Sequence, residues 1–215
     1  MNKIKILGVI IDENLSWEPQ TKQVKGRAVN VVKHLARTSR VLPQRSRRML
    51  YDALVCPHLS YGDVVWDGCG KKQQADLQRV HNFASKIILG AERRTPSREV
   101  LKAVGMVPLV EKRKIHQAVF LHKLVNGRGS AELCERLQEV HDKKGSMTEA
   151  KEGLRSTKTL LIPPKQHRTT KYENSTLWRA TKAWNSTGNH LKLIDDTSKF
   201  KVEVQREVWR TYHGC

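Results

Sequence analysis

The sequence predicts a mainly α-helical fold, an array of helices with a short N-terminal β-strand and a loosely packed C-terminal helical tail. Two observations carry this prediction. Apolar residues recur at helical spacing through most of residues 18–127, and Gly or Pro stands near the end of each such helical pattern. The apolar fraction of 38% provides a core, but it is too small to bury all 215 residues well. We therefore expect part of the chain to be loop or loosely packed.

The N-terminal segment 4–11, IKILGVII, predicts one buried strand that ends near Asp12 and Asn14. Its residues are β-branched or apolar on both faces, which is typical of a central strand. Few other strands are predicted nearby, so we expect its partners to lie outside this segment.

Residues 18–40 predict the first helix, and a second helix is expected to start at Pro43. The apolar stripe of the first helix consists of Val24, Ala28, Val31, Val32 and Leu35. We expect the second helix to be broken or kinked at Pro57, because proline lacks the backbone N–H that an α-helix uses.

Three further helices are expected at 71–89, 97–105 and 108–126. Gly90, Gly105 and Gly127 follow their last turns, as C-terminal capping glycines do. Ser97 with Glu99 marks the start of the second of these helices. The inward face of the first is expected to hold Leu77, Val80, Ala84, Ile87 and Ile88.

The remainder of the chain is less regular. A short helix is expected at 131–140, a polar linker at 142–156, an extended segment at 159–162, and helices at 174–184 and 198–212. We expect four segments: 1–17, a helical domain at 18–127, a linker with short elements at 128–172, and a helical tail at 173–215.

The charge distribution points to a polyanionic partner. The chain carries 40 Lys and Arg against 21 Asp and Glu, a net charge of +19. Between Gln20 and Arg48 there are nine basic residues and no acidic one. Such a local field favours nucleic acid, whereas the alternative is a solvated basic face without a particular partner. A basic helical face with few aromatic residues favours contact with the backbone of a duplex over stacking on single strands.

We expect nine cations to contact nucleic-acid phosphates. Seven lie on the first two helices, and two on the helix at 71–89 continue that surface. They are Lys22, Lys25, Lys33, Arg37, Arg45, Arg47, Arg48, Arg79 and Lys86.

No catalytic or metal site is predicted. Polymerases hold two metal ions on carboxylates from separate strands, but the only pair of adjacent aspartates, Asp195-Asp196, is better explained as the cap of the following helix. Cys134 with His141 could contribute to a zinc site, yet a second ligand pair is missing. The histidines are expected to lie in the core or on the surface and not to bind a metal ion. We expect no cofactor in this chain, and a binding domain rather than an enzyme.

The cysteine and hydropathy patterns favour a reducing compartment and no membrane span. The four cysteines lack a CxxC pair or a disulfide framework, and no apolar run approaches the length of a membrane span. We therefore expect an intracellular protein, nuclear or cytoplasmic, without a membrane partner. Trp66 and Tyr61 could stack on bases, but their apolar neighbours favour packing.

Four segments, in order along the chain, resemble the region downstream of the catalytic palm in reverse transcriptases of non-LTR, jockey-like retrotransposons. KILGVIIDENLSW (5–17) is similar to K-x-LGV-x-x-D-x-x-L-x-W, and YDALVCPHLSYGDVVW (51–66) to Y-x-x-L-V-x-P-x-L-x-Y-x-x-x-V-W. Residues 77–127 resemble the family's LQ-x-x-QN…RTP…R segment, and WNSTGNHLKLIDDTSKFK (184–201) resembles its terminal WN-x-L-P…FK stretch. Two positions depart from the pattern: Thr187-Gly188 replaces Leu-Pro, and Gln20 or a neighbour replaces a His.

The resemblance implies a thumb-like helical bundle that grips the template–primer duplex, RNA or RNA–DNA or DNA, of an RNA-directed DNA polymerase. Residues 1–17 would then be the end of the palm, 18–127 the thumb, and the missing fingers and palm a further partner. Mg²⁺ and its acidic ligands would belong to that missing palm, so we expect this chain to be inactive alone. The rivals are a transposon relic without a specific partner, and an active polymerase or nuclease, against which the missing acids argue.

Overall fold

A computed structural model of the chain describes residues 2–137 and 173–214. It is mainly helical with a short β-hairpin at the N-terminus, which confirms the predicted fold class. The chain divides into two compact units, Met1–Arg113 (unit 1) and Lys114–Cys215 (unit 2). The functional boundaries predicted at residues 17, 127 and 172 stay predictions.

The N-terminal segment is a two-stranded antiparallel hairpin, so the prediction of a single buried strand at 4–11 was wrong. β1 (Lys3–Ile6) pairs with β2 (Val9–Asp12), with Ile6 opposite Val9. Leu7 (φ 46°) and Gly8 (φ 86°) form the two-residue connection. Positive φ at both positions is what a type I′ hairpin turn requires. The strand therefore finds its partner in its own neighbour, and β1 is exposed along its length.

The hairpin is held against the first helix, α1 (Glu18–Thr38), by two buried side chains. The Asp12 carboxylate accepts hydrogen bonds from the backbone N–H groups of Ser16 and Trp17, both at 3.0 Å. Gln20, 2% exposed, accepts the N–H of Ile10 at 2.9 Å. Burial raises the pKa of Asp12, but the hydrogen bonds from Ser16 and Trp17 outweigh it, so the pKa lies below its usual value.

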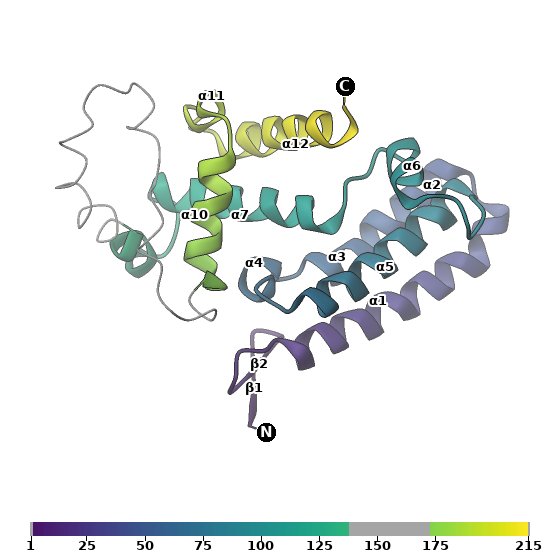
Figure 1. Ribbon diagram of the computed structural model, residues 1–215, viewed down its shortest axis with the longest axis horizontal. Helices are drawn as coiled ribbons and strands as arrows, with labels where there is room; N and C mark the ends of the chain where they lie inside the picture. The colour runs from purple at the N-terminus through teal and green to yellow at the C-terminus, as the bar shows by residue number, and fades with distance from the viewer. Residues whose placement is uncertain (1, 138–172, 215) are drawn as a thin grey trace. The chain divides into compact units, whose positions relative to one another are not determined.

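The core of unit 1 lies between α1 and α5 (Lys71–Leu89). Figure 1 shows these two helices side by side, and they are in close contact along their length. The predicted stripes face this core, although Val31 and Ile87 lie at its edge, only partly buried. Each large apolar side chain that is fully buried contributes about 1.5–3 kcal/mol to folding.

The segment around Pro57 is continuous helix, so of the two predicted outcomes the break was wrong, while the kink stays a prediction. α2 (Gln44–Leu50) continues through a π-helical turn, η2 (Tyr51–Val55), into α3 (Cys56–Ser60). In the π-turn the N–H of Cys56 donates to the carbonyl of Tyr51, five residues back. This wider turn accommodates the ring and the missing N–H of Pro57. The chain changes direction instead at Tyr61 (ψ 116°) and Gly62 (φ 61°), before α4 (Asp63–Trp66).

The three later helices of the array confirm the predicted boundaries closely. α5 ends at Leu89 with Gly90 at φ 74°, and α6 (Ser97–Ala103) is followed by Gly105 at φ 65°. α7 (Leu109–Val125) begins in unit 1, continues in unit 2 and is followed by Gly127 at φ 65°. A short 3₁₀ turn, η1 (Ser39–Val41), joins α1 to α2.

Unit 2 surrounds an aromatic core. The His122 ring of α7 stacks on Phe200 of α12 (Thr197–His213), with ring centroids 4.2 Å apart. Trp184 of α10 (Thr176–Ser186) lies 5.7 Å from Phe200. α11 (Asn189–Lys192) connects α10 to α12. Residues 131–137 are helical, as predicted, while the linker at 142–156 and the extended segment at 159–162 lie outside the described residues.

Candidate nucleic-acid interface

Four of the nine predicted phosphate-binding cations lie exposed on α1 and α2. They are Lys22, Lys33, Arg37 and Arg45, which we call the α1–α2 cations. Within residues 2–137 and 173–214, none of these four side chains forms an ion pair with an acidic side chain. Lys22, Lys33 and Arg37 share one helical face and span roughly 22 Å along α1 at 1.5 Å per residue. Such a row can follow the phosphates of a nucleic-acid backbone.

Lys25 and Arg79 instead share one carboxylate. Lys25 Nζ lies 2.8 Å from Asp76 Oδ2, and Arg79 Nη1 lies 2.7 Å from Asp76 Oδ1. The hydrogen bond from Lys25 is the main cause that lowers the pKa of Asp76 below its usual value. These contacts join α1 to α5. Because Arg79 remains 77% exposed, this trio still presents one net positive charge to solvent.

Arg47 and Arg48 are partly buried and bonded within unit 1. Arg47 donates from Nε to the Leu42 carbonyl and from Nη1 to the Ile87 carbonyl, both at 2.9 Å. Arg48 donates from Nη1 to the Val104 carbonyl at 2.6 Å and pairs with Asp52 at 2.7 Å. These bonds fasten α2 to the end of α5 and to the residue after α6. Their predicted contact with phosphate stays a prediction.

Lys86 lies in a cationic pocket that the sequence did not indicate. Its Nζ donates to the Arg93 carbonyl at 2.6 Å. The pocket has a volume of about 400 Å³, and four cations and an aromatic ring are among its lining residues: Arg40, Arg47, Lys86, Arg93 and Phe83. We call it the Arg40–Arg93 pocket. No acidic side chain lines it.

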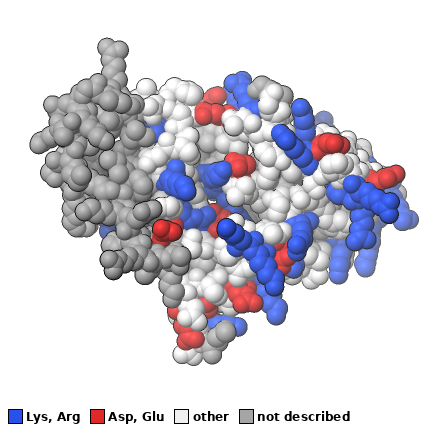
Figure 2. Space-filling view, in the orientation of Figure 1, with Lys and Arg blue, Asp and Glu red and all other residues white. Residues whose placement is uncertain are grey.

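Basic side chains also gather elsewhere on unit 1. Figure 2 shows Lys and Arg concentrated over the end of the unit where α2 and α6 are labelled in Figure 1. Arg94, Arg98 and Lys102 belong to the segment that contains α6 and are exposed. For the Arg40–Arg93 pocket, the sequence does show two adjacent cations, Arg93 and Arg94. It does not show that Arg93 lies near Arg40, because that proximity depends on how α1 and α5 pack.

The stretch 51–66 contributes Tyr51, Val55, Leu59 and Trp66 to the core of unit 1. Trp66 is fully buried and donates from Nε1 to the Tyr61 carbonyl at 2.9 Å, which confirms the packing interpretation for Trp66. Tyr61 itself is 59% exposed, and its hydroxyl donates to the Leu7 carbonyl at 2.8 Å. Packing was predicted for Tyr61 as well, and the contact that it makes lies at the surface of unit 1 and not in the core. It rests against the hairpin turn, close to Gly8.

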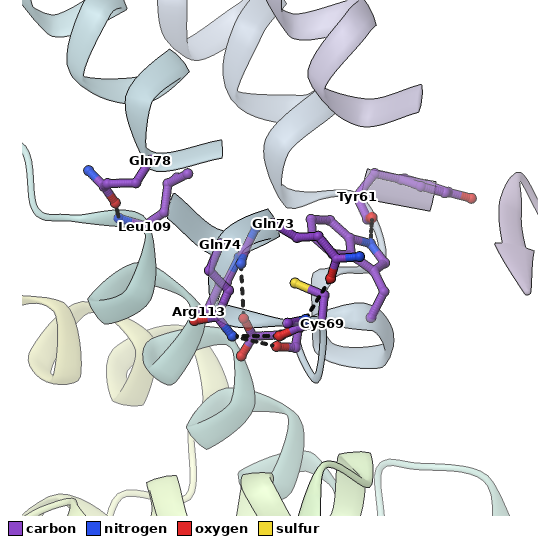
Figure 3. Close-up of polar contacts among 10 residues, drawn as sticks. Tyr61, Cys69, Gln73, Gln74, Gln78, Leu109 and Arg113 are labelled. Atoms are coloured by element: carbon purple, nitrogen blue, oxygen red, sulfur yellow. Dashed lines mark hydrogen bonds and ion pairs between the residues drawn. The ribbon is translucent and has the colours of Figure 1, made fainter. Parts of the chain in front are cut away.

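Arg113 is a buried cation that sequence reasoning did not single out. Figure 3 shows it directed at the loop that carries Cys69, beside Gln74. Its Nη1 lies 3.0 Å from Asp67 Oδ1, and its guanidinium carbon lies 4.6 Å from the centre of the Trp66 ring. Burial lowers the pKa of Arg113 below its usual value. At 3% exposure this residue positions the loop and cannot reach a phosphate.

A polar row on α5 fixes the neighbouring loops. Gln73 accepts the N–H of Gly70 at 2.6 Å, and Gln74 donates to the carbonyls of Asp67 and Cys69. Gln78 accepts the N–H of Leu109 at 2.8 Å (Figure 3). These bonds hold residues 67–70 against α5 and satisfy the Gly70 N–H at the start of that helix.

His81 and Tyr51 form a buried pair. The Tyr51 hydroxyl lies 2.6 Å from His81 Nδ1, and His81 Nε2 lies 3.0 Å from the Val107 carbonyl. Because that carbonyl can only accept, Nε2 carries the proton, and Nδ1 accepts from Tyr51. Burial lowers the pKa of His81 to about 4, so the ring is neutral near pH 7. The pair is structural.

The metal-site alternatives receive no support from the described residues. Within residues 2–137 and 173–214, no three His, Cys, Asp or Glu side chains are grouped to hold a metal ion. Asp196 caps α12, accepting the N–H of Lys199 at 2.7 Å, as predicted. Cys134 donates to the Leu124 carbonyl at 3.5 Å, and His141 lies outside the described residues.

Comparisons with protein-family models, with curated proteins and with solved structures found no match. No helix in the described part of the chain is long and apolar enough to span a membrane.

Proposed function

We propose that this chain binds nucleic-acid duplex, RNA–DNA or RNA, through its phosphate backbone, as the thumb-containing C-terminal region of a non-LTR retrotransposon reverse transcriptase. The observation that carries the binding proposal is the row of exposed, unpaired cations on α1 and α2. The parentage rests on the four ordered segments that resemble that family. Polymerisation is not proposed for this chain alone.

Release of counterions from the nucleic acid would drive this binding. Each Lys or Arg that neutralises a phosphate frees a condensed cation from the nucleic acid, which favours binding at low salt. The α1–α2 cations keep their charge available, since no carboxylate among the described residues neutralises them. Three of the four stand on one helix, α1, so on binding the cost in conformational entropy falls mainly on their side chains. Backbone contact of this kind carries no sequence preference.

The test compares two variants of the full chain that lose the same charge. One replaces Lys22, Lys33, Arg37 and Arg45 with Gln. The other replaces Lys123, Lys199, Lys201 and Arg210, which are equally exposed but lie in unit 2. Binding to a labelled duplex is measured over a salt series by fluorescence anisotropy. The slope of log K against log salt should flatten by about 0.9 for each lost contact with B-form DNA, and by a comparable amount for the other duplexes.

The first variant should flatten the slope by an amount that corresponds to several lost contacts. The second variant should leave the slope close to that of the parent chain. Equal effects of both variants would show that binding depends on the net charge of the chain and not on where the cations lie. No binding of the parent chain at low salt, or binding independent of salt, would refute the proposal.

A second candidate is that the basic residues are structural and the chain is a relic without a partner. It is favoured by the bonds of Lys25, Arg47, Arg48 and Lys86 within unit 1. Duplex binding at low salt separates the two, because a folded chain without a partner binds no duplex, and thermal unfolding followed by circular dichroism shows first whether the chain is folded. A chain without a cooperative transition cannot present a fixed binding face.

A further inference from the structure

The Arg40–Arg93 pocket combines features that a purely phosphate-gripping surface does not need. It lies where the end of α1, α2 and the C-terminal end of α5 meet in unit 1. Four cations line it without an acidic residue. One of its walls is the Phe83 ring, which is 50% exposed.

The positive charge of the pocket is not consumed by the helix end beside it. The C-terminus of α5 carries a partial negative charge, of the order of half an elementary charge. Its carbonyls are already occupied: Ile87 accepts from Gly90 and Arg47, and Lys86 accepts from Ala91. Four full positive charges therefore exceed that partial charge, and the pocket favours an anion.

Arg47 forms a pre-ordered part of the pocket. Its Nε and Nη1 are held by the Leu42 and Ile87 carbonyls, so the guanidinium keeps one orientation. Its Nη2 has no acceptor among residues 2–137 and 173–214. Gly90 lies directly beneath, since a Cβ at that position would come within 3.4 Å of Arg47 Nη1. A donor that is fixed before binding loses less entropy when it meets a phosphate.

Phe83 supplies the second chemistry. It lies three and four residues before Lys86 and Ile87, hence on the same face of α5. An exposed aromatic ring beside cations is the arrangement on which unpaired bases stack while the backbone is neutralised. A paired base inside a duplex cannot present its face in this way.

We propose that the Arg40–Arg93 pocket binds one unpaired nucleotide of a nucleic-acid strand, with the base on Phe83 and the adjoining phosphate among Arg40, Arg47 and Arg93. The volume of about 400 Å³ is near the lower end of the range for ligand pockets, which suits a single nucleotide. This inference rests on the proposed function and narrows its ligand to a duplex that carries a single-stranded extension.

The experiment compares a blunt duplex with the same duplex carrying a short unpaired extension, using the full chain and fluorescence anisotropy at one salt concentration. The parent chain should bind the extended duplex more tightly. Phe83→Ala should lose roughly ten-fold in affinity for the extended duplex and leave the blunt duplex unaffected. Phe83→Trp should retain the preference. Leu54→Ala, which truncates a side chain that is 51% exposed and away from the pocket, serves as the matched control and should change neither.

The outcomes separate this inference from the function it rests on. Equal binding of both duplexes by the parent chain overturns the pocket and leaves duplex binding intact. Absence of blunt-duplex binding, with extended or single-stranded ligand still bound in a Phe83-dependent way, supports the pocket and refutes the duplex grip. If inorganic phosphate alone displaces the extension and Phe83→Ala has no effect, the pocket is a plain anion site and the nucleotide assignment is wrong. Since Phe83, Arg40 and Arg93 are exposed, unchanged circular dichroism should accompany Phe83→Ala and Arg40→Gln/Arg93→Gln, and the double variant should weaken the extended duplex selectively.

Discussion

α1 of unit 1 and α12 of unit 2 are both amphipathic helices with one face in a core, but they carry their charges differently. After Glu18, α1 has only basic charged residues, and those on its outer face have no acidic neighbour along the helix. α12 alternates signs, and Arg206 pairs with Glu203 at 2.6 Å. This pair neutralises one cation of α12, whereas Lys199, Lys201 and Arg210 remain exposed. Both units are basic, so what distinguishes α1 is that its cations after Glu18 share the helix with no acidic residue.

The cores of the two units also differ in the polar groups that they bury. Unit 1 buries an ion pair, Arg113 with Asp67, and a neutral His81, whereas unit 2 buries His122 in a stack with Phe200 and Trp184. Polar groups buried in a core must keep their partners, because an unpaired one costs far more than the pair contributes. Unit 1 should therefore be the more sensitive of the two to a single polar substitution.

The largest effect is expected for Arg113→Ala. It leaves the Asp67 carboxylate buried without its cation and should lower the free energy of unfolding by about 3–5 kcal/mol. Arg206→Ala breaks the exposed pair on α12 and should cost less than about 1 kcal/mol. Urea unfolding measures both. Similar small losses would show that the buried pair of unit 1 does not distinguish the cores.

His81 should make stability depend on pH. Its pKa in the folded chain, about 4, lies below the usual 6.5, so the unfolded chain binds the extra proton first. Stability should be complete above about pH 6.5 and fall progressively as the pH drops toward 4, by up to about 3 kcal/mol at 1.36 kcal/mol per pKa unit.

The control for this prediction is His81→Gln, whose amide can accept from Tyr51 and donate to the Val107 carbonyl without titrating. It should flatten the pH dependence of the urea midpoint between pH 6.5 and 4, while His34→Gln, at an exposed position, should not. A profile that is the same in all three chains would show that His81 is not the group responsible.

The two helices also differ at their N-terminal ends. α12 is capped by its own preceding residue, Asp196, whereas the residues just before α1, Ser16 and Trp17, donate their N–H groups to Asp12 in the hairpin. Asp196→Ala should therefore cost about 1 kcal/mol. Asp12→Ala should cost more, because it also leaves the hairpin without its connection to α1. Thermal unfolding of both variants ranks them, and the reverse order would contradict this reading of the hairpin.

The smallest effect concerns Gly26, which lies in the middle of α1 on the face of the α1–α2 cations. A Cβ there meets nothing within 4 Å, so Gly26→Ala should raise the free energy of unfolding by about 0.5–1 kcal/mol. If the duplex approaches this face closely, the same variant should also weaken duplex binding. Stabilisation without any change in binding would place the duplex elsewhere on unit 1.

Helix boundaries were predictable because they are local. The limits of α5 follow from apolar spacing and from Gly90, which alone adopts the left-handed conformation at low cost, and Asp196 caps α12 through its own neighbours. The hairpin was missed because Leu7 adopts a positive φ that its side chain gives no reason to expect. The continuity of the helix at Pro57 was not predictable, because the π-turn before it goes with the burial of Tyr51 and Val55, which depends on tertiary contacts.

The sequence by itself determined the helical class, most helix ends and the basic excess between Gln20 and Arg48, since each depends on residues within a few positions of one another. Only the tertiary structure decided which cations remain available. It brought Arg40 and Arg93 to one pocket, engaged Arg47 and Arg48 with backbone carbonyls, and buried Arg113 beside Asp67. The physical reason is that a side chain's charge is available to a partner only if packing leaves it in solvent without a neighbour, and packing joins residues that are distant in sequence.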